Sequence, residues 1–83
     1  MKYPMYCIRD NKVGFMAPTC DQSDSSAIRN FSYAVNGKDG IMNYSPSDFD
    51  LYKIGEFDDE KGVVTPCVPE NICSGISVYG DKK

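Results

Sequence analysis

The chain has 83 residues, of which 41% are hydrophobic and 12% aromatic, so it can form one small domain with a modest core. Its formal charge is −3, and residues 31–60 carry seven carboxylates against two lysines, so any nucleic-acid-binding function must use a local basic face. No apolar run reaches the roughly 18 residues of a membrane span, and no signal-peptide core follows Met1. We therefore expect an intracellular protein with no membrane partner.

Residues 1–17 are predicted to form a first β-hairpin. The first strand alternates, and its two faces carry Tyr3, Met5 and Cys7 on one side and Lys2, Tyr6 and Ile8 on the other. Pro4 has no amide donor, which favours an edge strand or a bulge. Residues 10–12 are typical of a turn and residues 13–16 of a return strand, which Pro18 and Thr19 end.

A single clear helix is predicted over residues 23–36. Its apolar side chains recur at helical spacing and form one stripe, which consists of Ala27, Ile28, Phe31, Ala34 and Val35. Ser23 or Asp24 can cap the start of this helix. Asn36 and Gly37 predict a left-handed end. A helix with one apolar stripe is expected to lie across a sheet.

Residues 45–65 combine a capped helical turn with a second hairpin. Ser45 is expected to accept from the amide of Asp48 through its side chain, with Pro46 at the first helical position. A bulge at Gly55 and Glu56 returns Phe57 to the face of Tyr52 and Ile54. Residues 58–62 then predict a turn closed by a left-handed Gly62, followed by a return strand over residues 63–65.

Residues 66–83 are expected to form an irregular tail, because Pro66, Pro69 and Gly75 interrupt them. A short strand over residues 76–79 can add to the sheet, and the last four residues are expected to fray. The whole chain, residues 1–83, is therefore interpreted as one α+β domain. Its predicted order is β-β-α-β-β, a small antiparallel sheet from two hairpins with one helix packed on a face.

The four cysteines and the absence of histidine restrict the chemistry. Cys7, Cys20, Cys67 and Cys73 are not spaced as zinc ligands, and the absence of a secretion signal favours reduced thiols. A secreted domain stapled by disulfides is the alternative. Without histidine, the Ser-His and Cys-His nucleophile pairs are excluded. No phosphate-binding or calcium-loop motif occurs. We expect neither an enzyme nor a cofactor, and the carboxylates of residues 58–60 are interpreted as a solvated turn.

Aromatic and basic side chains are mixed on the first hairpin and the helix, which is typical of proteins that hold single strands by stacking and phosphate contacts. The phosphate-binding candidates are Lys2, Arg9, Lys12, Arg29 and Lys53. The stacking candidates are Tyr3, Tyr6 and Tyr52.

Several segments together resemble a known viral family. They include Tyr6-x-Ile8-Arg9-Asp10, Ala27-Ile28-Arg29-x-Phe31, Ser45-Pro46-x-Asp48-Phe49 and, most specifically, Ile54-Gly55-Glu56-Phe57-Asp58-Asp59. Over roughly residues 3–65 the chain resembles the small nonstructural, DNA-binding proteins of gokushoviruses, which are microviruses with circular single-stranded DNA genomes. The resemblance implies a non-capsid protein of the bacterial cytoplasm that acts in replication or in the switch to single-strand packaging. It supplies no binding residues.

Two function hypotheses follow. The first is a phage accessory protein that binds single-stranded DNA without sequence specificity and acts as a dimer or larger homo-oligomer, which would extend a modest basic face. The alternative is an acidic protein-interaction module, in which residues 48–60 engage the host replication machinery or the viral procapsid.

Overall fold

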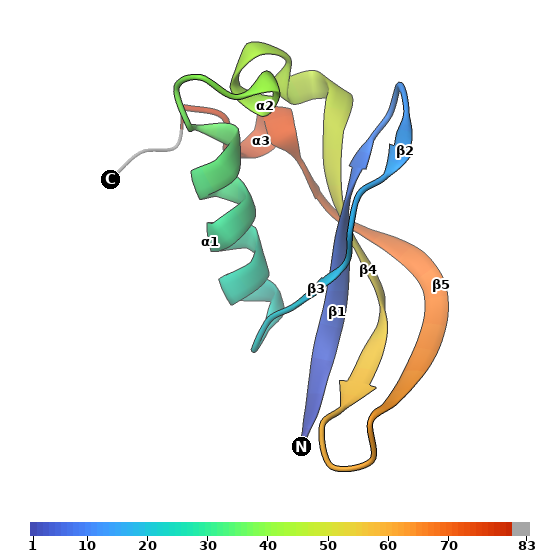
Figure 1. The fold of residues 1–83 in the computed structure, drawn as a ribbon. Coiled ribbons are helices and arrows are strands. Elements are labelled where there is room, and N and C mark those ends of the chain that lie inside the picture. Colours follow the sequence, from blue (N-terminus) through green and yellow to red (C-terminus); the bar gives the residue numbers. More distant parts are fainter. Residues whose placement is uncertain (81–83) are drawn as a thin grey trace.

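The computed structural model describes residues 1–80 and contains one curled antiparallel sheet with its helices on one side (Figure 1). The strands are β1 (Lys2–Asp10), β2 (Gly14–Phe15), β3 (Thr19–Cys20), β4 (Phe49–Asp58) and β5 (Val63–Ser74). The helices are α1 (Asp24–Val35), α2 (Ile41–Tyr44), the 3₁₀ turn η1 (Pro46–Asp48) and α3 (Gly75–Val78). The sheet order is β2-β1-β4-β5, and β3 pairs with the same edge of β1 as β2 does. The predicted α+β class is confirmed.

The first hairpin forms, but the chain does not leave the sheet after it. Asp10 lies opposite Gly14, as a tight turn over residues 11–13 requires. The return strand ends at Phe15, before Pro18 and Thr19, but the chain then bends back and pairs with β1 again, so that Cys20 lies opposite Met5. Pro4 precedes the residues paired with β3, and on that edge its carbonyl accepts from the amide of Asp21 at 3.2 Å. An interior strand therefore tolerates this proline near its end.

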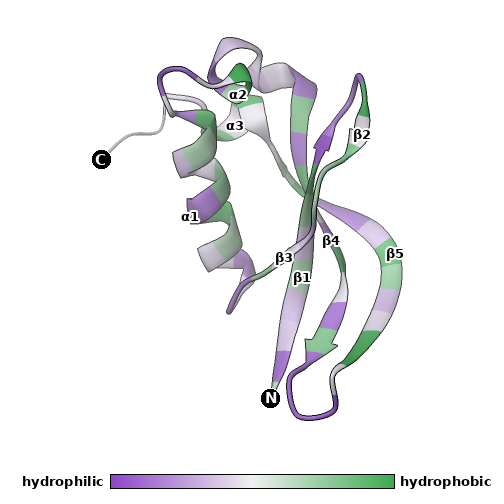
Figure 2. Cartoon of the chain, viewed as in Figure 1, coloured by the Kyte–Doolittle hydropathy of each residue, from purple (hydrophilic) through white to green (hydrophobic). Residues whose placement is uncertain are grey.

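Helix α1 begins where the sequence predicts, since the Ser23 side chain caps it by accepting from the amide of Ser26 at 3.2 Å. Ala27, Phe31 and Val35 are buried against the sheet. Figure 2 shows hydrophobic residues along this side of α1. Burying side chains of the size of Phe31 and Val35 contributes about 1.5–3 kcal/mol each. The predicted left-handed end is wrong, because among residues 1–80 only Gly14, Gly62 and Gly80 have positive φ. The amide of Asn36 instead continues the helical bonding to Ser32.

The connection from α1 to β4 holds two short helices, α2 and η1. Only the second was predicted, and its cap is different. The Ser45 side chain makes no capping bond, and the Asp48 amide donates to the Ser45 carbonyl at 3.0 Å. Because the Asp48 amide already donates to this carbonyl, it does not need the Ser45 hydroxyl as an acceptor.

The second hairpin carries the predicted turn and a bulge that is displaced from the predicted place. Gly62 has φ +68° and closes the turn, which is hydrophilic throughout in Figure 2. The pairing of β1 with β4 skips Ile54, because Met5 lies opposite Gly55 and Tyr6 opposite Lys53. The extra residue is therefore Ile54, not Gly55 or Glu56. The consequence for Phe57 is the predicted one, a return to the face of Tyr52.

The prediction of an irregular tail is wrong for residues 66–74, since β5 runs on to Ser74. Pro66 and Pro69 are tolerated because β5 is an edge strand, and residues 67–69 bulge out between the pairs Gly55–Pro66 and Lys53–Glu70. The predicted strand over residues 76–79 is also wrong. Those residues belong mainly to α3, whose start is capped by the Ser74 side chain through the amide of Ser77. Residues 81–83 lie outside the described residues.

Strand alternation gives the sheet two different faces. One face packs on the helices and includes Tyr6, Ile8, Phe49 and Leu51. The other face, termed here the open face, has no helix of residues 1–80 over it. By pairing register, its residues on the first four strands are Tyr3, Met5, Cys7 and Arg9 of β1, Phe15 of β2, Cys20 of β3, and Asp50, Tyr52, Gly55 and Phe57 of β4.

Candidate nucleic-acid interface

An aromatic and cationic cluster lies at one end of the open face. The rings of Phe15 and Tyr52 meet edge to face, with centroids 5.3 Å apart and planes at 73°. The guanidinium carbon of Arg9 lies 5.5 Å from the centroid of Phe15. Phe15 is 48% exposed, so its ring remains accessible on this face. An arginine beside exposed rings combines a stacking surface with a phosphate-binding group.

The Arg9 side chain has spare hydrogen-bonding capacity. Its Nη1 donates to Asn11 at 3.5 Å, which is at the limit of a hydrogen bond. Its Nε is buried and has no acceptor among residues 1–80. Within the described residues Arg9 takes part in no ion pair. Its guanidinium is held mainly by the ring of Phe15, so it can turn toward an incoming acceptor without first breaking an ion pair.

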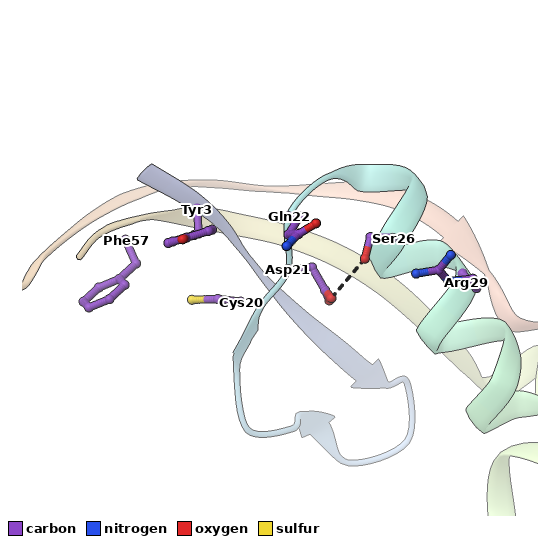
Figure 3. Close-up of a pocket in the computed structure, with 7 residues that line it drawn as sticks. All are labelled: Tyr3, Cys20, Asp21, Gln22, Ser26, Arg29 and Phe57. Carbon is purple, nitrogen blue, oxygen red and sulfur yellow. Dashed lines mark hydrogen bonds between the residues drawn. The ribbon is translucent and has the colours of Figure 1, made fainter. Parts of the chain in front are cut away.

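A groove of about 540 Å³ lies at the other end, at the sheet edge where β3 leads into α1 (Figure 3). Tyr3 and Phe57 lie directly opposite each other on β1 and β4 and line it together with Cys20. The rest of the lining comes from Asp21 and Gln22 after β3 and from Ser26 and Arg29 of α1. The groove thus places two rings at one end and a guanidinium at the other, as Figure 3 shows.

The acidic hairpin lies mostly away from the open face. Glu56 and Asp58 flank Phe57 in β4, so alternation directs them to the opposite side. The Asp58 carboxylate accepts from the amides of Glu60 and Lys61 at 2.9 and 3.2 Å, and these bonds lower its pKa. Asp59 pairs with the amino group of Met1 at 2.7 Å. Much of the negative charge therefore stabilises the hairpin turn and does not face the aromatic surface.

The structure brings some of the predicted site residues together and separates others. Tyr3, Arg9 and Tyr52 lie on the open face, and Arg29 lines the same groove as Tyr3, at its other end. Lys2 lies opposite Asp58 on the other face, and Lys12 projects from the first turn within 4.0 Å of Asp48.

Tyr6 and Lys53 belong to the fold. Tyr6 is 1% exposed, and its hydroxyl donates to Asp24, so it cannot stack on a base. Lys53 Nζ lies 3.3 Å from the same carboxylate. The sequence alone does not separate Tyr6 from the stacking candidates, because strand alternation shows two faces but not which of them the helix covers.

Three residues of the interface were not among the predicted site residues: Phe15, Phe57 and Asp21. The signal for Phe57 was present, since the predicted bulge already returned it to the face of Tyr52. The place of Phe15 on the open face follows from the register of the first hairpin, because Phe15 lies opposite Arg9. Asp21 could not be found, because it reaches the groove only through the unpredicted return of β3 to the sheet.

The described residues show neither a metal-binding cluster nor a disulfide. Residues 1–80 hold no cluster of three or more cysteine, aspartate or glutamate side chains suited to a metal ion. The four cysteines are free thiols. Burial raises the pKa of the Cys7 thiol, and burial together with nearby Asp50 raises that of Cys73. No helix within residues 1–80 is both long and apolar enough to span a membrane.

The fold and the open face define a small α+β protein with an uncovered aromatic sheet surface. The sequence model described as Phage ORF5 protein matches residues 3–78, and the chain belongs to that bacteriophage protein family. No curated protein and no solved structure matches the chain.

Proposed function

We propose that this phage protein binds single-stranded DNA on its open face, largely independently of sequence. The observation that carries the proposal is the pair of aromatic sites, Phe15–Tyr52 with Arg9 at the ring of Phe15, and Tyr3–Phe57 in a groove whose other end holds Arg29. Rings that stack on bases, with arginines for the phosphates, bind single strands whatever their sequence. The open face favours a single strand over a duplex, whose bases are already stacked on one another.

The spacing of the two aromatic sites supports contact with more than one base. The cross-strand rows of Tyr3 and Cys7 lie four residues apart on β1, which at the rise of a strand is about 13 Å. That separation is too large for one base to span. A strand laid along β1 would meet Phe57 and Tyr3 at one end and Tyr52 and Phe15 at the other.

The family and the viral resemblance give this activity a context. We place it in the cytoplasm of the host bacterium, as a nonstructural function in genome replication or in the switch to single-strand packaging, and with no enzymatic step of its own. Self-association into a dimer or larger oligomer would join several modest open faces into one track. Light scattering coupled to size exclusion, with and without oligonucleotide, tests the oligomer separately from binding.

Fluorescence anisotropy with labelled oligo-dT at low salt tests the proposal. The expected result is binding that single-stranded competitors displace better than a duplex does and that salt weakens. Tyr52→Ala should weaken binding by about 5- to 150-fold, the range for one stacking ring.

Tyr44→Ala is the matched control, because Tyr44 is 83% exposed on α2, which lies on the helix side of the sheet and not on the open face. It removes the same ring and should leave affinity unchanged. Equal losses in both variants, or no binding by the wild-type protein, would overturn the proposal.

A further inference from the structure

Asp21 places a carboxylate in the groove. A groove that bound only phosphates would not be expected to contain a negative charge. Its amide donates to the carbonyl of Pro4 at 3.2 Å, which places it beside the strand position next to Tyr3. Its Oδ1 accepts from Asn30 at 2.9 Å and from Ser26 at 3.5 Å, both on α1. The side chain is therefore oriented by the protein, and Figure 3 shows it between Cys20 and Ser26.

The charge of Asp21 is not neutralised within the described residues. None of the ion pairs among residues 1–80 includes it, and Arg29, which lines the same groove, does not pair with it. Its Oδ2 receives no hydrogen bond from these residues. A phosphate placed directly beside Asp21 would be repelled. A hydrogen-bond donor carried on a flat ring would satisfy the free oxygen while stacking near Tyr3 or Phe57.

We propose that the groove is a base-selective subsite that takes guanine, with Asp21 accepting from the base edge. This inference rests on the proposed function, since it names the base preferred at one end of the same open face. Guanine presents two adjacent donors, N1–H and the 2-amino group. One would bind the free Oδ2, and the other would bind Oδ1 in place of the long 3.5 Å bond from Ser26. Adenine and cytosine present one amino group beside an acceptor, and thymine presents one N–H between two carbonyls. A paired donor set is what gives a carboxylate selectivity between bases.

The test compares oligo-dT strands that carry one central guanine, inosine, adenine or thymine, by competition anisotropy with the wild-type protein. The guanine strand should bind roughly tenfold more tightly than the thymine strand, as one good bidentate contact allows. Inosine lacks the 2-amino group and should lose most of this preference. This comparison changes only the DNA, so it does not depend on how any variant folds.

Asp21→Asn replaces the free oxygen by a donor and should abolish the guanine preference while keeping binding to oligo-dT. Asp39→Asn, in the exposed loop after α1, is the control and should keep the preference. Equal affinity for all four strands overturns the guanine subsite and leaves the proposed function standing. A preference that inosine retains in full overturns it too. Failure of every strand to bind overturns both.

Discussion

The hydroxyl of Tyr6 donates a hydrogen bond to the carboxylate of Asp24, which joins the first strand to the first turn of α1. Lys53 of β4 pairs with the same carboxylate at 3.3 Å. Burial and the hydrogen bond to Asp24 raise the pKa of Tyr6 well above its usual value, and the bond from Tyr6 lowers the pKa of Asp24. The three side chains fix where α1 lies on the sheet, and therefore where Arg29 stands at the groove.

Tyr6→Phe is expected to destabilise the protein without weakening DNA binding. It removes one hydrogen bond to a charged group, and because the Asp24 side chain is 49% exposed, the loss should be about 1 kcal/mol. In a domain of this size that corresponds to a fall in melting temperature of roughly 4–8 °C. Urea or thermal unfolding measures the loss. An unchanged melting temperature together with lost DNA binding would instead place Tyr6 in the interface.

The pKa of Asp24 predicts an acid-dependent part of the stability. Because the folded-state pKa is lowered, the ionised carboxylate stabilises the fold above its unfolded pKa of about 3.9, and this contribution is lost as pH falls through the folded value. The wild-type protein should therefore be more stable than Asp24→Asn at pH 7, and the difference should shrink below about pH 4. Urea midpoints of both proteins across this range measure it. A difference that stays constant with pH would contradict the assignment.

The local signals in the sequence were sufficient for several elements of the fold. The stripe of Ala27, Phe31 and Val35 determines α1, and Gly62 determines the hairpin turn, because each depends on residues close together in the chain. The wrong predictions concern residues whose structure depends on contacts with distant segments of the chain. Pro66 and Pro69 interrupt a strand in most settings, yet here they lie on β5, beside which residues 1–80 place no further strand.

The site was predicted less completely than the fold, for a related reason. Tyr3, Arg9 and Tyr52 lie on one face because a bulge at Ile54 keeps the two strands in step, and the sequence indicated a bulge nearby. Which face the helix covers depends on the connection through β3, which carries only two residues of pairing. That connection put Tyr6 in the core and brought Asp21 and Arg29 to the groove.

Gly75 provides a test of packing that the sequence did not suggest. A Cβ at this position would lie 2.2 Å from the carbonyl oxygen of Pro46 and 3.0 Å from that of Phe49, so α3 could not keep its place. Gly75→Ala should cost about 1–3 kcal/mol or more, the range for overpacking against backbone. Gly37→Ala is the comparison, because Gly37 lacks positive φ and its Cβ would meet only ordinary contacts. It should be neutral or slightly stabilising, as removing a glycine restricts the unfolded chain. Equal losses in both variants would contradict this packing.

Arg29 provides a test for one phosphate contact at the groove. It is exposed on α1, lines the groove and takes part in no ion pair within residues 1–80, so a phosphate is its natural partner. Each neutralised phosphate of a single strand adds about −0.7 to the slope of log K against log salt concentration. Arg29→Gln should therefore reduce the magnitude of that slope by about 0.7 and weaken binding most at low salt. Anisotropy titrations at several salt concentrations measure the slope.

Lys38→Gln removes another exposed cation, from the loop after α1, and should leave the slope as it is. If both variants lower the slope by the same amount, the protein attracts DNA only through its overall charge, and Arg29 has no phosphate of its own.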